Sequence, residues 1–297
     1  MRNYLGLFYS LLSDRVNRYY LVHGRNSNLI DNEKRMWKCF TWLKHEYGPF
    51  LDSLPLQELP VSSCAPPIIW WCWLQGEENA PELCRASLAS LRKHLSDYII
   101  RVVSEENLDQ FVTIPDIIRE KYASGIIPNA QYSDIVRTLL LVQHGGTWID
   151  STVFCTGYNV PILETPFFVY QNWKFGAHQA SVCSNWLISA APSHPILEAV
   201  LALLLKYWKE NESLLDYFLY HLFFHMATEK YPALWDAVPR FSNIPPHIMQ
   251  FEMFKPYDSI RYKHLCMMSD FHKLNWKAQE LEKVSPDSLY AYIMHKT

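Results

Sequence analysis

Apolar residues recur along this chain with two different periods, which together predict an α/β fold. Residues 68–74 form a continuous apolar run that is typical of a buried parallel strand, and residues 98–103 are expected to form the second strand. Residues 81–95 lie between these segments and carry leucines at helical spacing, so we expect a strand–helix–strand unit. The alternation continues with a helix over 116–122, a strand over 166–170 and helices over 195–208 and 214–227. This order predicts crossover connections and a parallel sheet.

The first sixty residues follow a different pattern. Apolar residues within 5–16 recur close to every 3.6 positions and predict a helix, and residues 33–47 predict a second amphipathic helix that ends near Pro49. Several prolines then mark a linker. We therefore expect a helical N-terminal extension over residues 1–60 and one α/β domain over residues 61–297.

Charge is distributed unevenly over these two parts. The chain has a net charge of −3, yet residues 1–45 hold eight lysines and arginines against three acids. A basic, aromatic-rich leader on an acidic body favours contact with an anionic surface such as the inner face of the plasma membrane. Nucleic acid is excluded as a partner, because the acidic body would be repelled by phosphates. Packing of the leader helices onto the body, with the same apolar stripe buried, is the alternative.

Composition narrows the class further. A chain of 297 residues with 49% hydrophobic residues can bury a substantial core. The longest apolar stretches, 196–205 and 214–226, do not reach the roughly 20 residues that span a bilayer, and the N-terminus does not resemble a signal peptide. Seven scattered cysteines without a C-x-x-C pair predict free thiols. We expect a cytoplasmic protein, soluble or peripheral at the membrane.

Residues 129–153 contain most of the candidate chemistry. Ser133 is a suitable N-cap for a helix whose first turn would hold Asp134, where the helix dipole favours negative charge. Arg137 lies three positions later on the same helix face. An acid and a base on one face indicate either a ligand-handling pair or an ordinary surface ion pair.

The same segment then delivers a carboxylate to the end of a strand. Gly145 and Gly146 are expected to end the helix, and the β-prone residues 147–149 follow. Asp150 comes where this strand stops, which in α/β sheets is a common position for ligand-handling residues.

This ordered set resembles the nucleotide-sugar signature of glycosyltransferase family 32 and the capsular polysaccharide synthesis proteins. The matching positions are Ser133-Asp134-Ile135-Val136-Arg137, Leu139-Leu140 and Gly145-Gly146-Thr147-Trp148-Ile149-Asp150-Ser151-Thr152, with further matches at 67–76 and, more weakly, 269–277. The resemblance spans roughly residues 61–280. It implies a GT-A fold, a Rossmann-like nucleotide-binding sheet, to which the N-terminal helical extension is added.

The resemblance also implies roles for individual residues. Asp134 and Arg137 correspond to the pair that contacts the ribose and the donor sugar and orients the site. Gly145 and Gly146 belong to the donor-binding signature. With Asp150, the acid–base pair makes up the expected catalytic set.

Metal dependence is open at the sequence level. In the family an Asp-x-Asp pair bridges Mn²⁺ or Mg²⁺ to the diphosphate, and the metal acts as a Lewis acid on the leaving group. Asp150 matches the first acid, but Thr152, a neutral and weaker oxygen ligand, replaces the second. His272 is a candidate for a further metal ligand. The alternative is that His272 is an ordinary core or surface histidine whose hydrogen bonds are satisfied within the protein.

Aromatic and basic residues are candidates for holding the nucleotide, because bases commonly stack on aromatic rings. Strand alternation puts Trp71 and Trp73 on one face and Trp70 on the other. We choose Trp73 as the stacking ring and Trp71 as the second candidate, and a core role is the alternative for both. Lys273 and Trp276 lie in the C-terminal match, where a lysine could neutralise diphosphate charge.

The sequence therefore predicts an enzyme that moves a sugar from a nucleotide-diphosphate donor, UDP-linked, to a surface-polysaccharide intermediate, a glycan or lipid-linked glycan. The resemblance implies retention of anomeric configuration. Asp216 and His221 could face the acceptor or could belong to an aromatic core helix. A non-catalytic nucleotide-sugar-binding or scaffold protein is the rival hypothesis, and Thr152 is the residue that keeps it open.

Overall fold

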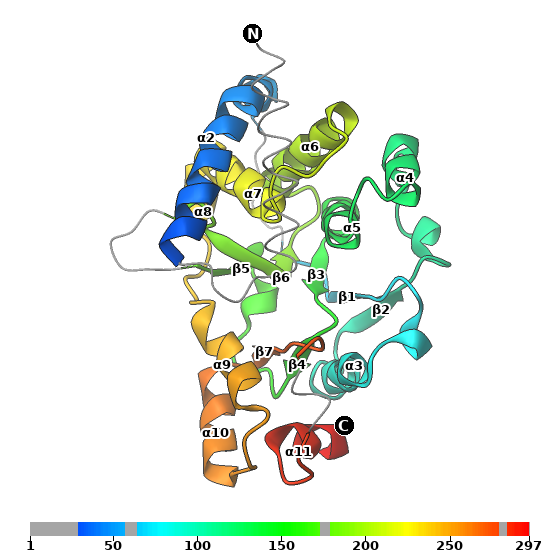
Figure 1. Ribbon diagram of the computed structural model, residues 1–297, viewed down its shortest axis with the longest axis vertical. Coiled ribbons are helices and arrows are strands. Elements are labelled where there is room, and N and C mark those ends of the chain that lie inside the picture. The colour runs from blue at the N-terminus through cyan, green and yellow to red at the C-terminus, as the bar shows by residue number, and fades with distance from the viewer. Residues whose placement is uncertain (1–28, 57–63, 173–178, 279–283, 297) are drawn as a thin grey trace.

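The computed structural model describes residues 29–56, 64–172, 179–278 and 284–296. A five-stranded mixed sheet with the order β2-β1-β3-β6-β5 lies at its centre, as Figure 1 shows. The strands are β1 (Ile68–Cys72), β2 (Ile99–Val103), β3 (Gly146–Ile149), β5 (Phe167–Gln171) and β6 (Cys183–Ala190). β1 pairs in parallel with β2 and β3, whereas β6 runs antiparallel to both β3 and β5. A small antiparallel pair, β4 (Val153–Cys155) and β7 (Phe271–Lys273), lies beside it.

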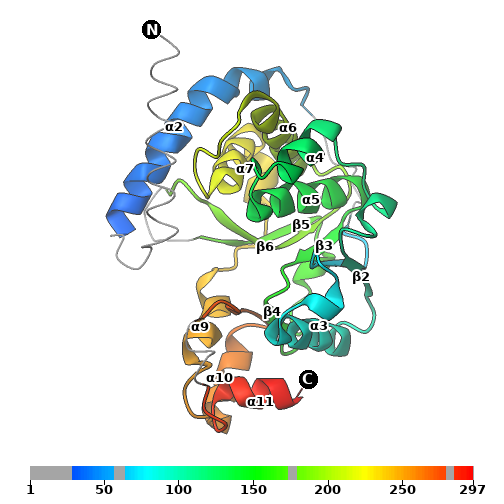
Figure 2. The ribbon, with the colours of Figure 1, turned by 45° about the vertical axis from the view of Figure 1, so that its right-hand side comes forward.

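Helices cover both faces of the central sheet. The described helices are α2 (Leu29–Ser53), α3 (Glu82–His94), α4 (Asp116–Ala123), α5 (Asn129–His144), α6 (Pro195–Glu210), α7 (Leu219–Lys230), α8 (Pro232–Asp236), α9 (Ile244–Glu252), α10 (Ser259–Met268) and α11 (Leu289–Lys296). In Figure 1 α2, α5, α6 and α7 lie above the sheet, and α3 lies below it. Figure 2 shows α9, α10 and α11 together at the end of the molecule opposite to α2 and α6.

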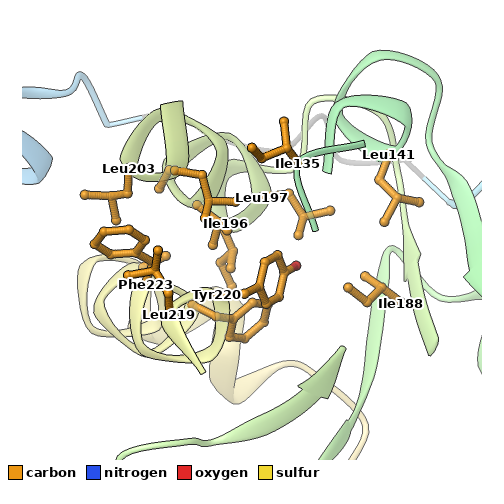
Figure 3. Packing of buried hydrophobic residues seen from close by; sticks show 14 of the residues in the cluster. Ile135, Leu141, Ile188, Ile196, Leu197, Leu203, Leu219, Tyr220 and Phe223 are labelled. Carbon is orange, nitrogen blue, oxygen red and sulfur yellow. The ribbon is translucent and has the colours of Figure 1, made fainter. Parts of the chain in front are cut away.

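The alternation of tryptophans in β1 separates two hydrophobic cores. Trp70 belongs to the core that β6 shares with α5, α6 and α7, part of which Figure 3 shows, including Ile135, Leu197 and Phe223. Trp71 belongs to the other core, against α3. Each face of β1 is therefore buried, which is why its sequence is continuously apolar.

The expected α/β class is confirmed, but the sheet is mixed and not purely parallel. The difference is β6, which the apolar pattern missed because Ser184, Asn185 and Ser189 interrupt its hydrophobic positions. The side chain of Ser189 is satisfied inside the sheet, where its hydroxyl donates to the carbonyl of Leu163 and accepts from Thr147. A strand whose polar groups are paired in this way does not need an apolar sequence.

The starts of two helices differ from the sequence prediction. α5 begins at Asn129, so Ser133 lies inside the helix and is not its N-cap. Because Asp134 is then beyond the first turn, the helix terminus does little to stabilise its charge. α7 begins at Leu219, and the preceding residues 211–218 form a loop held by the buried carboxylate of Asp216.

The helix predicted to end near Pro49 continues to Ser53. Although a proline inside a helix costs one backbone hydrogen bond, Leu51, two residues after Pro49, is buried in the core, and this packing keeps the last turn helical. Met36, Phe40 and Leu43 are also buried, against α7 and α6, so α2 contributes to the core of the α/β domain.

An ion pair attaches α2 to the loop before α7. Arg35 contacts the buried carboxylate of Asp216, whose other oxygen accepts a hydrogen bond from the backbone N–H of Phe218. The apolar stripe predicted within residues 5–16 lies outside the described residues. Across the described ranges, no helix is long and apolar enough to cross a membrane. All seven cysteines are free thiols, as expected.

Candidate active site

A cavity of about 820 Å³ opens where β1 and β3 end. Trp73 follows β1, Asp150 follows β3, and Lys273 is the last residue of β7. All three line this cavity, together with Asp134 and Arg137 from α5. The chain thus brings residues from both halves of the sequence to the carboxyl edge of the parallel strands, the edge at which α/β sheets bind ligands.

Asp150 is the most densely contacted carboxylate of the cavity. Its Oδ1 accepts a hydrogen bond from the indole N–H of Trp148 at 2.8 Å and lies 3.4 Å from Nη1 of Arg137. Its Oδ2 accepts a hydrogen bond from Nζ of Lys273 at 2.8 Å. Partial burial alone would raise the pKa of Asp150, but Lys273, Arg137 and the hydrogen bonds together hold it below the usual range. Asp150 is therefore an anion that positions two cations.

Lys273 also contacts the third residue of the Asp150-Ser151-Thr152 segment. Its Nζ lies 2.6 Å from Oγ1 of Thr152. The pairing of β4 with β7 sets Lys273 opposite Val153, and the backbone N–H of Leu274 donates to the carbonyl of Thr152. Backbone pairing therefore delivers the ammonium group to this position.

Arg137 is held on several sides. Its guanidinium donates to the carbonyl of Asn185 at 2.5 Å and to the carbonyl of Ser133 at 3.3 Å, and it lies 4.9 Å from the ring centroid of Trp148. The side chain is 7% exposed. A charge that is fixed in this way does not need to reorganise when a ligand arrives.

Asp134 lies on the other side of the same guanidinium. Its Oδ1 is 3.4 Å from Nη2 of Arg137 and accepts a hydrogen bond from the amide of Asn185 at 2.8 Å. Burial raises the pKa of Asp134 to about 7, although Arg137 acts in the opposite direction. Asp134 and Asp150 thus form a pair of acids around one cation with separated pKa values, an arrangement that is frequent at functional sites.

Aromatic rings line the cavity near Lys273. Trp73 and Trp276 meet edge to face with their centroids 5.6 Å apart, and Nζ of Lys277 lies 5.0 Å from the ring of Trp276. Trp73 is only partly buried, so part of its ring remains available to a ligand. Trp73 therefore lies in the cavity, and its role as the stacking ring stays a prediction.

Several predicted site residues lie away from the cavity. Trp71 is fully buried in the core and does not line it. Gly145 and Gly146 both have positive φ, and a Cβ on Gly146 would lie 2.6 Å from the carbonyl oxygen of Ile68. Gly146 is required for the close approach of β3 to β1, and Gly145 for the close approach of the turn to Pro192, so both glycines have a structural role.

His272 is the predicted metal ligand that the structure separates from Asp150. It is completely buried, it does not line the cavity, and its Nε2 lies 3.1 Å from Oγ1 of Thr156. Burial lowers its pKa to about 4. His272 points away from the cavity because adjacent residues of a strand point to opposite faces, and its neighbour Lys273 in β7 faces the cavity.

The remaining donor set does not fit a divalent cation. Both oxygens of Asp150 already contact cations, and the oxygen of Thr152 contacts Lys273. Within the described ranges, no group of three His, Cys, Asp or Glu side chains is placed to hold a metal. Hard cations prefer several carboxylate oxygens, and the second carboxylate of the cavity, Asp134, is already paired with Arg137 and Asn185.

Sequence patterns missed the lining residues of β6 and the nearby loops. Asn185 and Trp186 come from β6, Tyr217 from the loop before α7, and His247 from α9. The indole N–H of Trp186 donates to the amide oxygen of Asn243, which fixes this wall of the cavity. The available signal in the sequence was the polar residue Asn185 next to Trp186 within an otherwise apolar segment.

His221 and Asp216, which shared one hypothesis, have different positions. His221 lines the cavity, and burial lowers its pKa to about 3, so its imidazole is neutral. Asp216 does not line the cavity and anchors α2 through Arg35. Only His221 can face a ligand.

Comparisons with known proteins bear on this geometry. A family model described as "Capsular polysaccharide synthesis protein" matches residues 19–293. Among solved structures, one described as "PaToxG Glycosyltransferase" is 15% identical, with 91% of this chain and 98% of that chain covered and a TM-score of 0.41. Another, described as a transferase mutant, is 13% identical, with 70% and 91% covered and a TM-score of 0.33. No curated protein matches the chain. Both structural likenesses are distant.

Proposed function

Because the chain belongs to the capsular polysaccharide synthesis protein family, we propose that it is a glycosyltransferase of the GT-A type. It transfers a sugar from a nucleotide-diphosphate donor, a UDP-sugar, to a glycan or lipid-linked glycan intermediate of a surface polysaccharide. Membership of the family supports sugar transfer in general. The donor, the acceptor and retention of anomeric configuration are further parts of the proposal.

One observation carries the proposal, namely that two cations converge on Asp150 in a cavity that also exposes aromatic rings. Arg137 and Lys273 both contact this carboxylate, and Trp73 and Trp276 line the same space. A nucleotide sugar requires positive charge for its diphosphate and an aromatic face for its base. A cavity of about 820 Å³ has the size of a small-molecule site.

Catalysis in this proposal rests on positioning and electrostatics. The fixed guanidinium of Arg137 and the ammonium of Lys273 stabilise negative charge as it develops on the departing diphosphate. Asp150 orients both cations and stays ionised because they hold its pKa low. No side chain is assigned as a nucleophile.

The experiment is a screen for release of nucleoside diphosphate from a panel of nucleotide sugars, with capsular oligosaccharides as acceptors. We expect turnover with one donor, and NMR of the product reports the anomeric configuration. Binding of a nucleotide sugar without any turnover would instead support the rival hypothesis, a non-catalytic binding protein. The replacement of the second acid by Thr152 is the observation that favours this second candidate.

We also propose that the protein works in the cytoplasm at the inner face of the plasma membrane. The basic character of residues 1–45 supports this location, since each basic residue near an anionic surface contributes about 1 kcal/mol. Removing residues 1–28, a deletion that ends before α2, tests this location. The full-length protein should sediment with anionic vesicles at low salt and be released at high salt. Equal sedimentation of the truncated protein would contradict the role of the leader.

A further inference from the structure

We propose that the ammonium group of Lys273 takes the place of a divalent cation, so that sugar transfer by this protein needs no metal. This inference rests on the proposed function and specifies how its leaving group is stabilised. It follows from the position of one lysine between two oxygen-bearing side chains.

The position is defined by two short contacts. Nζ of Lys273 lies 2.8 Å from Oδ2 of Asp150 and 2.6 Å from Oγ1 of Thr152. These are the side chains at the first and third positions of the segment that resembles an Asp-x-Asp pair. The ammonium group therefore lies between the two oxygens that would otherwise be shared by a metal ion.

A metal ion would have to displace cations to enter this place. The other oxygen of Asp150 is engaged by the indole of Trp148 and by the guanidinium of Arg137. A divalent cation would meet two positive side chains and a single carboxylate, which is electrostatically unfavourable. Thr152 adds only a neutral oxygen, whereas a second aspartate would supply the charge that Mn²⁺ or Mg²⁺ requires.

The arrangement does not depend on a flexible side chain reaching across solvent. Lys273 is paired through the backbone with Val153, next to Thr152, and its side chain is 22% exposed. The same pairing turns His272 toward Thr156 on the opposite face. The register of β4 and β7 thus places Lys273 in the cavity and turns His272, the histidine predicted as a metal ligand, away from it.

Charge at the site suits a diphosphate. Three positive side chains line the cavity, Arg137, Lys273 and Lys277, against the carboxylates of Asp150 and Asp134. Because burial raises the pKa of Asp134 to about 7, its carboxyl group carries less than a full negative charge at neutral pH. A net positive field remains for the anion without any metal.

The transfer step balances without a further reactant. The bond between the anomeric carbon of the donor and the β-phosphate oxygen breaks, and its electron pair stays on the phosphate. The hydroxyl oxygen of the acceptor forms the new bond to the anomeric carbon, and its proton passes to the departing diphosphate. The ammonium of Lys273 donates a hydrogen bond to the phosphate as this charge develops.

Calorimetric titration of UDP and of Mn²⁺ into the full chain tests the inference. The wild type should bind UDP with the same affinity in EDTA and in millimolar Mn²⁺. Lys273→Met should lose about tenfold or more in UDP affinity, the effect of one charge-assisted hydrogen bond. Lys273→Arg should retain part of the affinity because it keeps the charge. Lys255→Met, in an exposed ion pair outside the cavity, is the matched control and should bind UDP like the wild type.

The combination of Thr152→Asp with Lys273→Met creates a metal site as the converse test. This double variant should bind Mn²⁺, and it should recover UDP affinity only when Mn²⁺ is present. Thermal melting of each variant verifies that it is folded. A wild type that binds Mn²⁺ more tightly than the double variant would overturn the inference.

The outcomes separate this inference from the proposed function. UDP binding by the wild type that disappears in EDTA would overturn metal independence and leave a nucleotide-sugar enzyme. Failure of the wild type to bind any nucleotide under either condition would overturn the proposed function and the inference with it. Equal loss of UDP affinity in Lys273→Met and Lys255→Met would show that Lys273 has no specific role.

Discussion

Asp134 and Asp150 contact the same guanidinium, yet the pKa values of their carboxyl groups are shifted in opposite directions. At one end of the cavity Asp150 faces Lys273 in addition to Arg137, and its pKa is held below the usual range. At the other end burial dominates, and the amide of Asn185 does not compensate, so the pKa of Asp134 rises to about 7. The two residues are of the same type, so the difference between their pKa values comes from their surroundings, mainly from the number of neighbouring cations.

The comparison also assigns different tasks to the two ends. The Asp150 end carries a permanent charge, two cations and the rings of Trp73 and Trp276, which suit the donor nucleotide. Asp134 carries a carboxyl group that titrates near neutral pH, and the neutral imidazole of His221 lines the same cavity. We expect the surroundings of Asp150 to determine donor binding, and the protonation state of Asp134 to modulate donor affinity.

Asp150→Ala should have the largest effect, a loss of turnover of at least about 10²-fold, the scale for removing one electrostatic stabiliser. Without this carboxylate Lys273 and Arg137 lose the anion that orients them. Steady-state release of nucleoside diphosphate measures the effect, and Asp236→Ala, in an exposed ion pair outside the cavity, is the control. If Asp134→Ala were the more damaging substitution, the assignment of the two ends would be reversed.

Trp73→Ala should weaken UDP binding by about 1–3 kcal/mol, the contribution of one stacked base. Trp73→Phe should be milder, because it keeps an aromatic face. Trp71→Ala provides the contrast: a cavity in the core costs about 3–5 kcal/mol of folding free energy, without a selective effect on nucleotide affinity. Calorimetry and thermal unfolding distinguish these results. UDP affinity that depends on Trp71 and not on Trp73 would assign the stacking of the base to Trp71.

Asp134→Asn should have the smallest effect, and it should appear as a changed pH dependence. As pH falls through about 7, the carboxyl group of Asp134 gains a proton and the cavity becomes more positive. Affinity for a nucleotide sugar, whose diphosphate does not titrate in this range, should therefore rise as pH falls from 8 to 6. About fivefold is expected, which corresponds to roughly 1 kcal/mol. The variant, which carries no titratable group there, should give a flat profile; a profile with the wild-type slope would assign the titration to another residue.

Much of the cavity could be predicted because its central residues lie close together in the sequence. Asp134 and Arg137 share a face of α5, and the glycine turn and β3 place Asp150 within the same unit. Local periodicity is sufficient for this, because a helix face and a strand end are defined by nearby residues. The position of Ser133 within α5 shows the limit, since helix boundaries depend on contacts beyond the segment.

The sequence by itself determined the α/β class and the α5–β3 unit, each from spacing within short segments, whereas the role of Trp73 as the stacking ring stays a prediction. Only the tertiary structure decided that Lys273 and not His272 meets Asp150, since the register of β4 and β7 joins residues about 120 positions apart. It also decided that β6 runs antiparallel and brings Asn185 to Asp134. Side-chain alternation fixes which residues share a face, but strand pairing fixes which faces meet, and that pairing depends on packing of the whole domain.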